Sequence, residues 1–146
     1  MKILMVVMSG LFVVVFSALS ALHVYWALGG PAGLDKAVPT IDGKPAFQPG
    51  ALLTVAVAAV LLGCAYVSLS LGFSSQFAMP YAHLAPYAGW GLAVMFAVRA
   101  IGDFKLVGFF RKIKGSHFAT FDSALYSPLC VVLSAGFVFL STAASA

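Results

Sequence analysis

Six residues of this 146-residue chain have side chains that could together form a binding site. They combine a histidine, an arginine and two aspartates with two aromatic rings: His23, Trp26, Arg99, Asp103, Asp122 and Tyr126. A histidine can carry a proton near neutral pH, an arginine can clamp an anion, and carboxylates can orient both. These residue types predict a site for a lipid-like or small polar molecule, with Trp26 and Tyr126 as its walls.

Purely structural roles are the alternative for the same residues. Arg99 and Asp103 are four positions apart, so on one helix they could form an ion pair that only stabilises the fold. His23 could be a hydrogen-bonded histidine at a membrane interface. Asp122 could cap the start of a helix. Both interpretations remain open from the residue types alone.

The composition indicates an integral membrane protein. Hydrophobic residues make up 62% of the chain and charged residues 8%, whereas soluble domains have roughly 25% charged residues. A water-soluble fold of this size could not bury so much apolar surface. The net charge of +4 does not indicate nucleic acid, because the basic residues lie beside long apolar runs. Membrane lipids are the expected partners.

Four apolar runs approach the roughly 20 residues that a helix needs to cross a bilayer. They cover approximately residues 3–28, 49–71, 86–104 and 124–143. The sequence therefore predicts an all-α fold, a four-transmembrane-helix bundle that forms a single membrane domain over residues 1–146. A cleavable signal peptide is the alternative for residues 1–22.

The connection between the third and fourth spans has apolar residues near helical spacing, with basic residues between them. This pattern predicts an amphipathic helix in the headgroup region. The basic residues expected at the membrane surface are Lys105, Arg111, Lys112 and Lys114.

The distribution of positive charge predicts the orientation. Six of the seven basic residues outside the spans lie in the first and third connections, and the seventh, Lys2, lies on the other side. By the positive-inside rule these connections are cytoplasmic and both termini are outside. The expected location is the inner membrane of a bacterium.

Other kinds of site have little support in the sequence. The chain has no glutamate, which excludes the H-E-x-x-H zinc motif and glutamate-rich di-iron sites. His83 is expected on the opposite side from His23 and His117, which argues against a three-histidine zinc site. The sequence predicts no metal site, and it leaves any cofactor unknown.

Three blocks carry a family resemblance: "HVYWALGG" at His23–Gly30, "RAIGDFKLVGFF" at Arg99–Phe110 and "HFATFDSALYSPLC" at His117–Cys130. With them the chain resembles a bacterial family of small four-helix membrane proteins catalogued as a domain of unknown function. The resemblance implies a four-span inner-membrane protein and transfers no activity, cofactor or catalytic residue. The blocks coincide with the cytoplasmic ends where the six candidate residues gather.

Three hypotheses for the function follow. The first is a polar site at the cytoplasmic end that binds, or binds and acts on, a lipid-like or small polar molecule. The second is an accessory or assembly subunit of a larger membrane complex. Besides membrane lipids, the partners considered are another membrane protein or, in a homo-oligomer, further copies of the chain. A small transporter is less favoured, because carriers place ionisable groups near the midplane and the span centres here are apolar.

Overall fold

The computed structural model describes residues 1–41, 44–112 and 116–145. Four helical segments are long and apolar enough to cross a membrane. The first two are α1 (Lys2–Ala27) and α3 (Ala51–Phe73). The third joins η1 (Ala82–Leu84) to α4 (Ala85–Ile101), and the fourth joins α5 (His117–Phe121), the π-helix η2 (Asp122–Tyr126) and α6 (Ser127–Ser145). The prediction of a multi-pass, four-helix membrane protein is confirmed.

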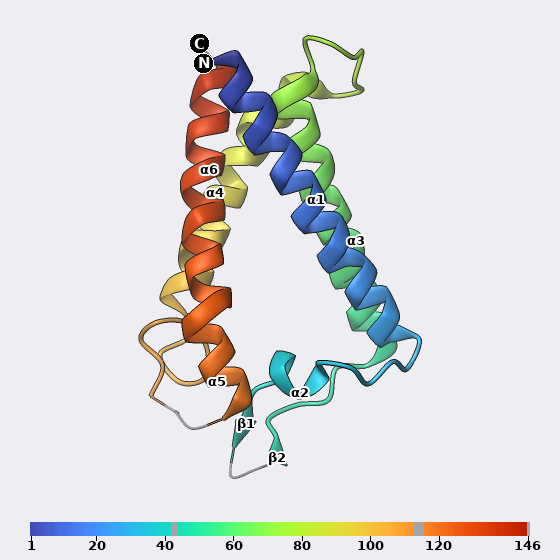
Figure 1. Ribbon diagram of the computed structural model, residues 1–146, viewed down its shortest axis with the longest axis vertical. Helices are drawn as coiled ribbons and strands as arrows, with labels where there is room; N and C mark the ends of the chain where they lie inside the picture. Colours follow the sequence, from blue (N-terminus) through green and yellow to red (C-terminus); the bar gives the residue numbers. More distant parts are fainter. Residues whose placement is uncertain (42–43, 113–115, 146) are drawn as a thin grey trace.

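The four segments form two pairs (Figure 1). Helix α1 packs along α3, and α4 packs along α6. The pairs meet at the end that carries both termini and the 74–81 connection, and they diverge towards the other end. This wide end carries the first and third connections. The side-by-side placement of the two basic connections therefore agrees with the sequence.

Small residues allow the close approach at the narrow end. A Cβ at Gly72 of α3 would collide with Ser9 of α1, and one at Gly89 of α4 would collide with Ser141 of α6. Without a hydrophobic force between helices in lipid, such small residues are what let backbones pack closely. Small residues thus bring α1 close to α3, and α4 close to α6, at this end.

Four phenylalanines close the interior halfway along the helices. Phe12 and Phe16 of α1 meet Phe96 of α4 and Phe137 of α6, with centroid distances of 5.3 to 6.2 Å between contacting rings. Phe16 and Phe137 are fully buried. This phenylalanine cluster joins the two helix pairs, and beyond it the pairs separate towards the wide end.

Short elements cover the wide end. The first connection holds the one-turn helix α2 (Leu34–Ala37) and an antiparallel pair of strands, β1 (Thr40–Ile41) and β2 (Lys44–Pro45). Figure 1 shows α2 lying across the space between the two diverging pairs. The sequence segment that joins α1 to α3 thus reaches the fourth helical segment.

The third connection differs from the prediction. Helix α4 ends at Ile101, because Gly102 adopts a φ of +88°, and the predicted continuation to residue 104 is wrong. Residues 103–112 form bends and turns, so the expected amphipathic helix is not formed there; residues 113–115, including Lys114, lie outside the described part of the chain. The N–H of Phe109 donates to the carbonyl of Ala100 (2.9 Å), which folds the connection back on the helix end.

Two glycines make that reversal possible. Gly102 and Gly108 both have positive φ, +88° and +87°. Their backbones touch, since a Cβ on either would collide with backbone atoms beside the other. Only glycine combines this conformation with so close an approach.

Candidate functional site

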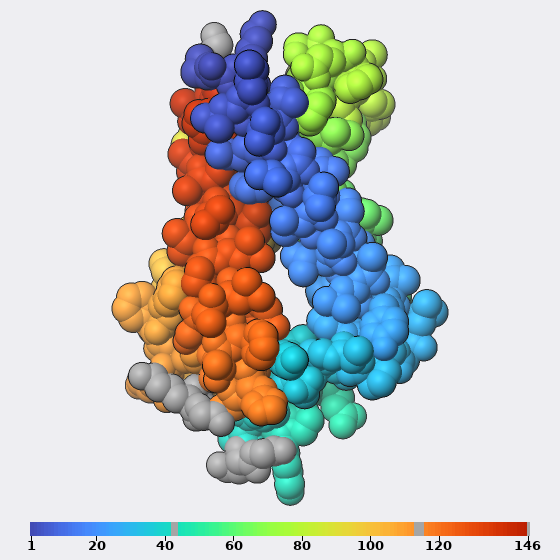
Figure 2. Space-filling view, in the orientation of Figure 1, coloured from blue at the N-terminus to red at the C-terminus, as the bar shows by residue number. Residues whose placement is uncertain are grey.

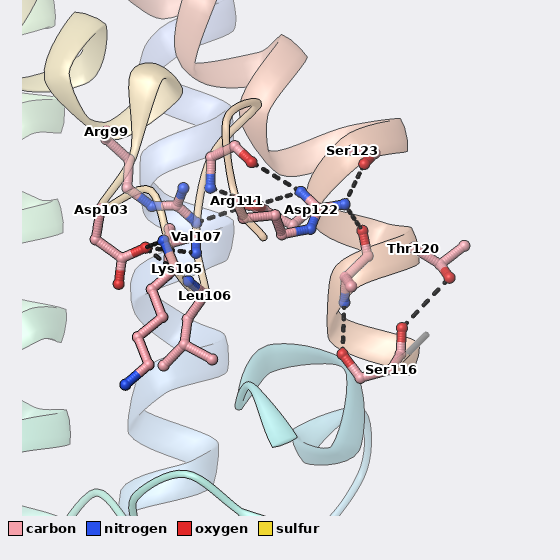
Figure 3. Close-up of polar contacts among 12 residues, drawn as sticks. Arg99, Asp103, Lys105, Leu106, Val107, Arg111, Ser116, Thr120, Asp122 and Ser123 are labelled. Atoms are coloured by element: carbon pink, nitrogen blue, oxygen red, sulfur yellow. Dashed lines mark hydrogen bonds and ion pairs between the residues drawn. The ribbon is translucent and has the colours of Figure 1, made fainter. Parts of the chain in front are cut away.

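The carboxylate of Asp122 lies at the centre of the polar contacts in the wide end (Figure 3). Its side chain is fully buried. Oδ1 accepts a hydrogen bond from Nη2 of Arg99 (2.9 Å). Oδ2 accepts from Nη1 of Arg111 (3.0 Å) and from the backbone N–H of Gly108 (2.7 Å). Arg99, Gly108, Arg111 and Asp122 are called the Asp122 cluster below.

The local backbone explains why Asp122 points inward. Pro128 has no N–H, so the α-helical hydrogen bond to Ala124 cannot form. The preceding segment, Asp122–Tyr126, widens into a π-helix, and the N–H of Ser127 bonds to the carbonyl of Asp122. Insertions of this kind occur frequently at functional sites. Here the widened turn keeps both Asp122 and Ser127 fully buried.

The prediction that Arg111 lies at the membrane surface is wrong, because only 8% of the residue is exposed. Besides Asp122, its guanidinium donates to the carbonyl of Gly108 (2.9 Å), to the carbonyl of Ala119 and to the hydroxyl of Ser123. The buried carboxylate and three oxygen acceptors outweigh the gain from placing Arg111 at the surface. Arg111 therefore ties the third connection to the fourth helical segment.

The contacts of Asp103 also differ from the prediction. The ion pair between Arg99 and Asp103 does not form, because α4 ends before Asp103 and the four-residue helical spacing is lost. Instead Oδ1 of Asp103 accepts the backbone N–H groups of three residues at 2.7 to 2.9 Å, those of Lys105, Leu106 and Val107. Burial tends to raise the pKa of Asp103, but the three donors outweigh it and lower the pKa below its usual range. Asp103 stabilises the turn after α4.

A cavity of about 770 Å³ lies at the wide end, among the first connection, α1, α3 and the start of the fourth segment. Its apolar wall includes Leu34, Val38 and Phe47. Its polar groups include Asp35, Thr54 and His117. A second cavity of about 280 Å³ shares several of these walls and adds His23. Trp26 and Thr54 line both cavities.

The space-filling view shows that the wide end is hollowed. Figure 2 shows an opening between α1 and α6, bounded below by α2. In the phenylalanine cluster, Phe137 of α6 contacts Phe12 and Phe16 of α1. The helix pairs therefore leave open space on the side of the molecule that carries the charged connections.

Three contacts hold α2 against the fourth segment. Nδ1 of His117 lies 3.2 Å from Oδ2 of Asp35, and the hydroxyl of Tyr126 donates to the carbonyl of Lys36 (3.2 Å). The ammonium of Lys36 lies 5.1 Å from the centroid of the Phe121 ring. The hydrogen bond from His117 lowers the pKa of Asp35, and Lys36 adds to this effect. Of the residues in these contacts, Asp35 and His117 line the larger cavity.

The six residues singled out in the sequence separate into different places. His23 bonds the carbonyl of Leu19 through Nδ1 (2.7 Å) and packs edge-on against Trp26, with both residues at the cavities. Arg99 and Asp122 belong to the Asp122 cluster, and neither cavity is lined by them. Asp103 stabilises a turn, and Tyr126 bonds α2. The fold therefore does not bring all six residues together in one site.

Of the basic residues expected at the membrane surface, Lys105 and Lys112 have exposed side chains. Among the residues that the structure describes, no group of three or more His, Cys, Asp or Glu side chains gathers where it could hold a metal. Two cavity residues, Asp35 and Thr54, were not predicted from the sequence. Only Asp35 had a signal, its position beside Lys36 in a charged connection.

Comparison with known proteins gives a family and no close relative. Neither the curated proteins nor the solved structures include a match to the chain. A family model does match, described as "Protein of unknown function (DUF3995)", and it covers residues 16–137. Because this range includes most of the four helical segments and both basic connections, the chain belongs to the DUF3995 family.

Proposed function

We propose that the protein is a membrane-embedded binding protein for a lipid-like or small polar molecule, which it holds in the cavity at its wide end. The observation that supports this proposal is the size of the cavity, about 770 Å³. Sites for small molecules and cofactors usually fall between roughly 300 and 1,000 Å³. The second cavity extends the available space along α1 and α3 towards His23.

The cavity walls suit an amphipathic molecule. Leu34, Val38 and Phe47 offer apolar contact, while Asp35 and His117 offer polar groups that can form hydrogen bonds with a ligand. Trp26 supplies a ring to both cavities, and its Nε1 already donates to the carbonyl of Ala32 (2.8 Å). A molecule with an apolar body and a polar end would therefore match this lining.

Binding is better supported than bond-making. The hydroxyl of Ser116, which lies next to His117 in the cavity wall, accepts the N–H of Ala119 (3.0 Å) as a helix cap. Engaged in this way, it is poorly placed to act as a nucleophile. The proposal accordingly assigns the cavity a ligand and no reaction.

The proposed setting is the inner membrane of a bacterium, with the wide end in the cytoplasm and both termini outside. Its support is the charge asymmetry: six basic residues lie in the two connections of the wide end and Lys2 at the other end. A single cysteine at exposed Lys112, in a chain without Cys64 and Cys130, tests the orientation. It should resist impermeant thiol reagents in intact cells, and labelling from outside would reverse the proposed topology.

A matched pair of threonine variants tests the binding proposal. Thr54 is 7% exposed, lines both cavities and bonds the carbonyl four residues earlier (3.1 Å). Thr142 makes the same kind of bond (2.7 Å) but is exposed near the narrow end. Thr54→Phe fills the cavities and should deplete the small molecule that co-purifies in mild detergent. Thr142→Phe should leave its molar ratio unchanged.

The measurement is extraction and mass spectrometry of each purified protein, with equal elution volumes as the control for folding. A molecule retained equally by both variants, or no molecule at all in the wild type, contradicts the proposal. Foreign polypeptides at a fixed stoichiometry, in the absence of a small molecule, would instead support the accessory-subunit alternative.

A further inference from the structure

The Asp122 cluster has one positive charge more than it has negative charges. Two guanidinium groups, of Arg99 and Arg111, share the single carboxylate of Asp122. Arg111 is almost completely buried and uses its two terminal nitrogens on four oxygen acceptors. Arg99 makes one hydrogen bond, through Nη2. The unbalanced charge therefore lies on Arg99.

Two unsatisfied polar atoms belong to the same cluster. Nη1 of Arg99 and Nε of Arg111 are buried and have no hydrogen-bond partner among the described residues. Buried N–H groups normally have partners. Two such N–H groups, one of them on the guanidinium that carries the unbalanced charge, suit a negatively charged ligand.

The protein offers few anions of its own for this role. The chain has no glutamate. Among the described aspartates, Asp35 contacts His117 and Asp103 accepts the N–H groups of its own turn. The side chain of Arg99 is still 34% exposed. It lies one helical turn beyond Phe96 of the phenylalanine cluster, towards the open, wide end.

We infer that Arg99 is the centre of an oxyanion site, which binds a phosphate group through its guanidinium. Guanidinium and phosphate are matched in charge and in hydrogen-bond geometry. This site is separate from the proposed cavity, whose lining does not include Arg99. The phosphate can belong to an anionic lipid headgroup or to a soluble molecule.

Native mass spectrometry in a neutral detergent tests the inference with three probes. These are dioctanoyl-phosphatidylglycerol, dioctanoylglycerol, which has no phosphate group, and inorganic phosphate. The wild type should bind phosphatidylglycerol or inorganic phosphate in preference to the lipid without phosphate. Arg99→Gln should weaken that binding by about tenfold, as expected for the loss of a charge-assisted contact.

Lys105→Gln is the matched control, because it removes the same charge from an exposed side chain six residues after Arg99. It should leave the affinity nearly unchanged. Phosphatidylglycerol that resists displacement by inorganic phosphate identifies a lipid headgroup. Direct binding of inorganic phosphate, with displacement of the lipid, identifies a soluble oxyanion.

Equal binding of both lipids, no binding of any probe, or equal losses in Arg99→Gln and Lys105→Gln would overturn the inference. If Arg99→Gln does not fold, Arg99→Lys replaces it. Arg99→Lys keeps the positive charge but lacks the planar set of donors of a guanidinium, so its affinity for the anion should be lower. The small molecule held in the cavity beside Thr54 should still co-purify with it. Unchanged anion binding in Arg99→Lys would also overturn the inference.

Discussion

Arg99 and Asp122, 23 positions apart in the chain, are joined by a 2.9 Å contact between Nη2 and Oδ1. The contact links the last turn of α4 to the first turn of η2. Because Asp122 also accepts the N–H of Gly108 and a guanidinium N–H of Arg111, one carboxylate gathers three separate segments. Loss of that carboxylate should therefore disturb the wide end as a whole.

Asp122→Asn should destabilise the protein strongly. The amide keeps the shape of the side chain, but it leaves two guanidinium groups without a negative charge. Removing one partner of a buried ion pair costs about 3 to 5 kcal/mol. The free energy of unfolding, measured by titration with sodium dodecyl sulfate, checks the prediction. Asp35→Asn is the control, since Asp35 is exposed, and a similar loss in both variants would contradict this role of Asp122.

Gly102→Ala should also destabilise the wide end. At a φ of +88° a Cβ is strained, and it would collide with the backbone at Val107. We expect a loss of more than about 2 kcal/mol in the free energy of unfolding. Gly91→Ala is the control, because Gly91 is in α4 and a Cβ there meets nothing within 4 Å. An unaffected Gly102→Ala protein would show that the reversal after α4 differs from the one described.

Phe137→Ala should weaken the contact between the two helix pairs. Phe137 is fully buried and packs on Phe12, Phe16 and Phe96. Truncation removes these contacts and leaves a cavity, at a cost of about 3 kcal/mol. Phe110→Ala, at a ring that is 63% exposed, is the matched control. Equal unfolding free energies for the two variants would contradict the proposed junction.

Acid should loosen α2 from the fourth segment. The hydrogen bond from His117 lowers the pKa of Asp35 in the folded protein. The contact therefore stabilises the folded protein at pH values above the unfolded pKa of about 4, and this stabilisation is lost as the pH falls below that value. In a Trp90→Phe background, the emission of Trp26 in the cavity wall reports the change. The transition should disappear in Asp35→Asn, and an identical acid transition in that variant would exclude Asp35 as its source.

The large features of the fold were predictable because they follow from composition. Long apolar runs and the bilayer thickness determine four spans, and the charge pattern places two connections on one side. The end of α4 was not predictable from hydropathy. It depends on the positive φ of Gly102 and on the backbone N–H groups that Asp103 accepts. Neither feature can be predicted from the number of apolar residues in a segment.

The candidate site was predicted only in part, for a similar reason. Arg99 and Asp122 were recognised as unusual, but their pairing needs the third connection to fold back on α4. That reversal depends on the positive φ angles of Gly102 and Gly108, which residue types and hydropathy do not show. Arg111 had the same local pattern as its exposed neighbour Lys112. Only the packed structure distinguishes it, through the four oxygen acceptors that surround its guanidinium.

The most direct test of the central claim, a ligand held in the wide end, is a crystal structure of the protein purified gently with its own lipids. The account predicts continuous density in the cavity beside Trp26, Thr54 and His117, with the helix pairs apart beyond the phenylalanine cluster. Helix pairs in contact along their whole length, with side chains filling the cavity and no added density, would contradict it.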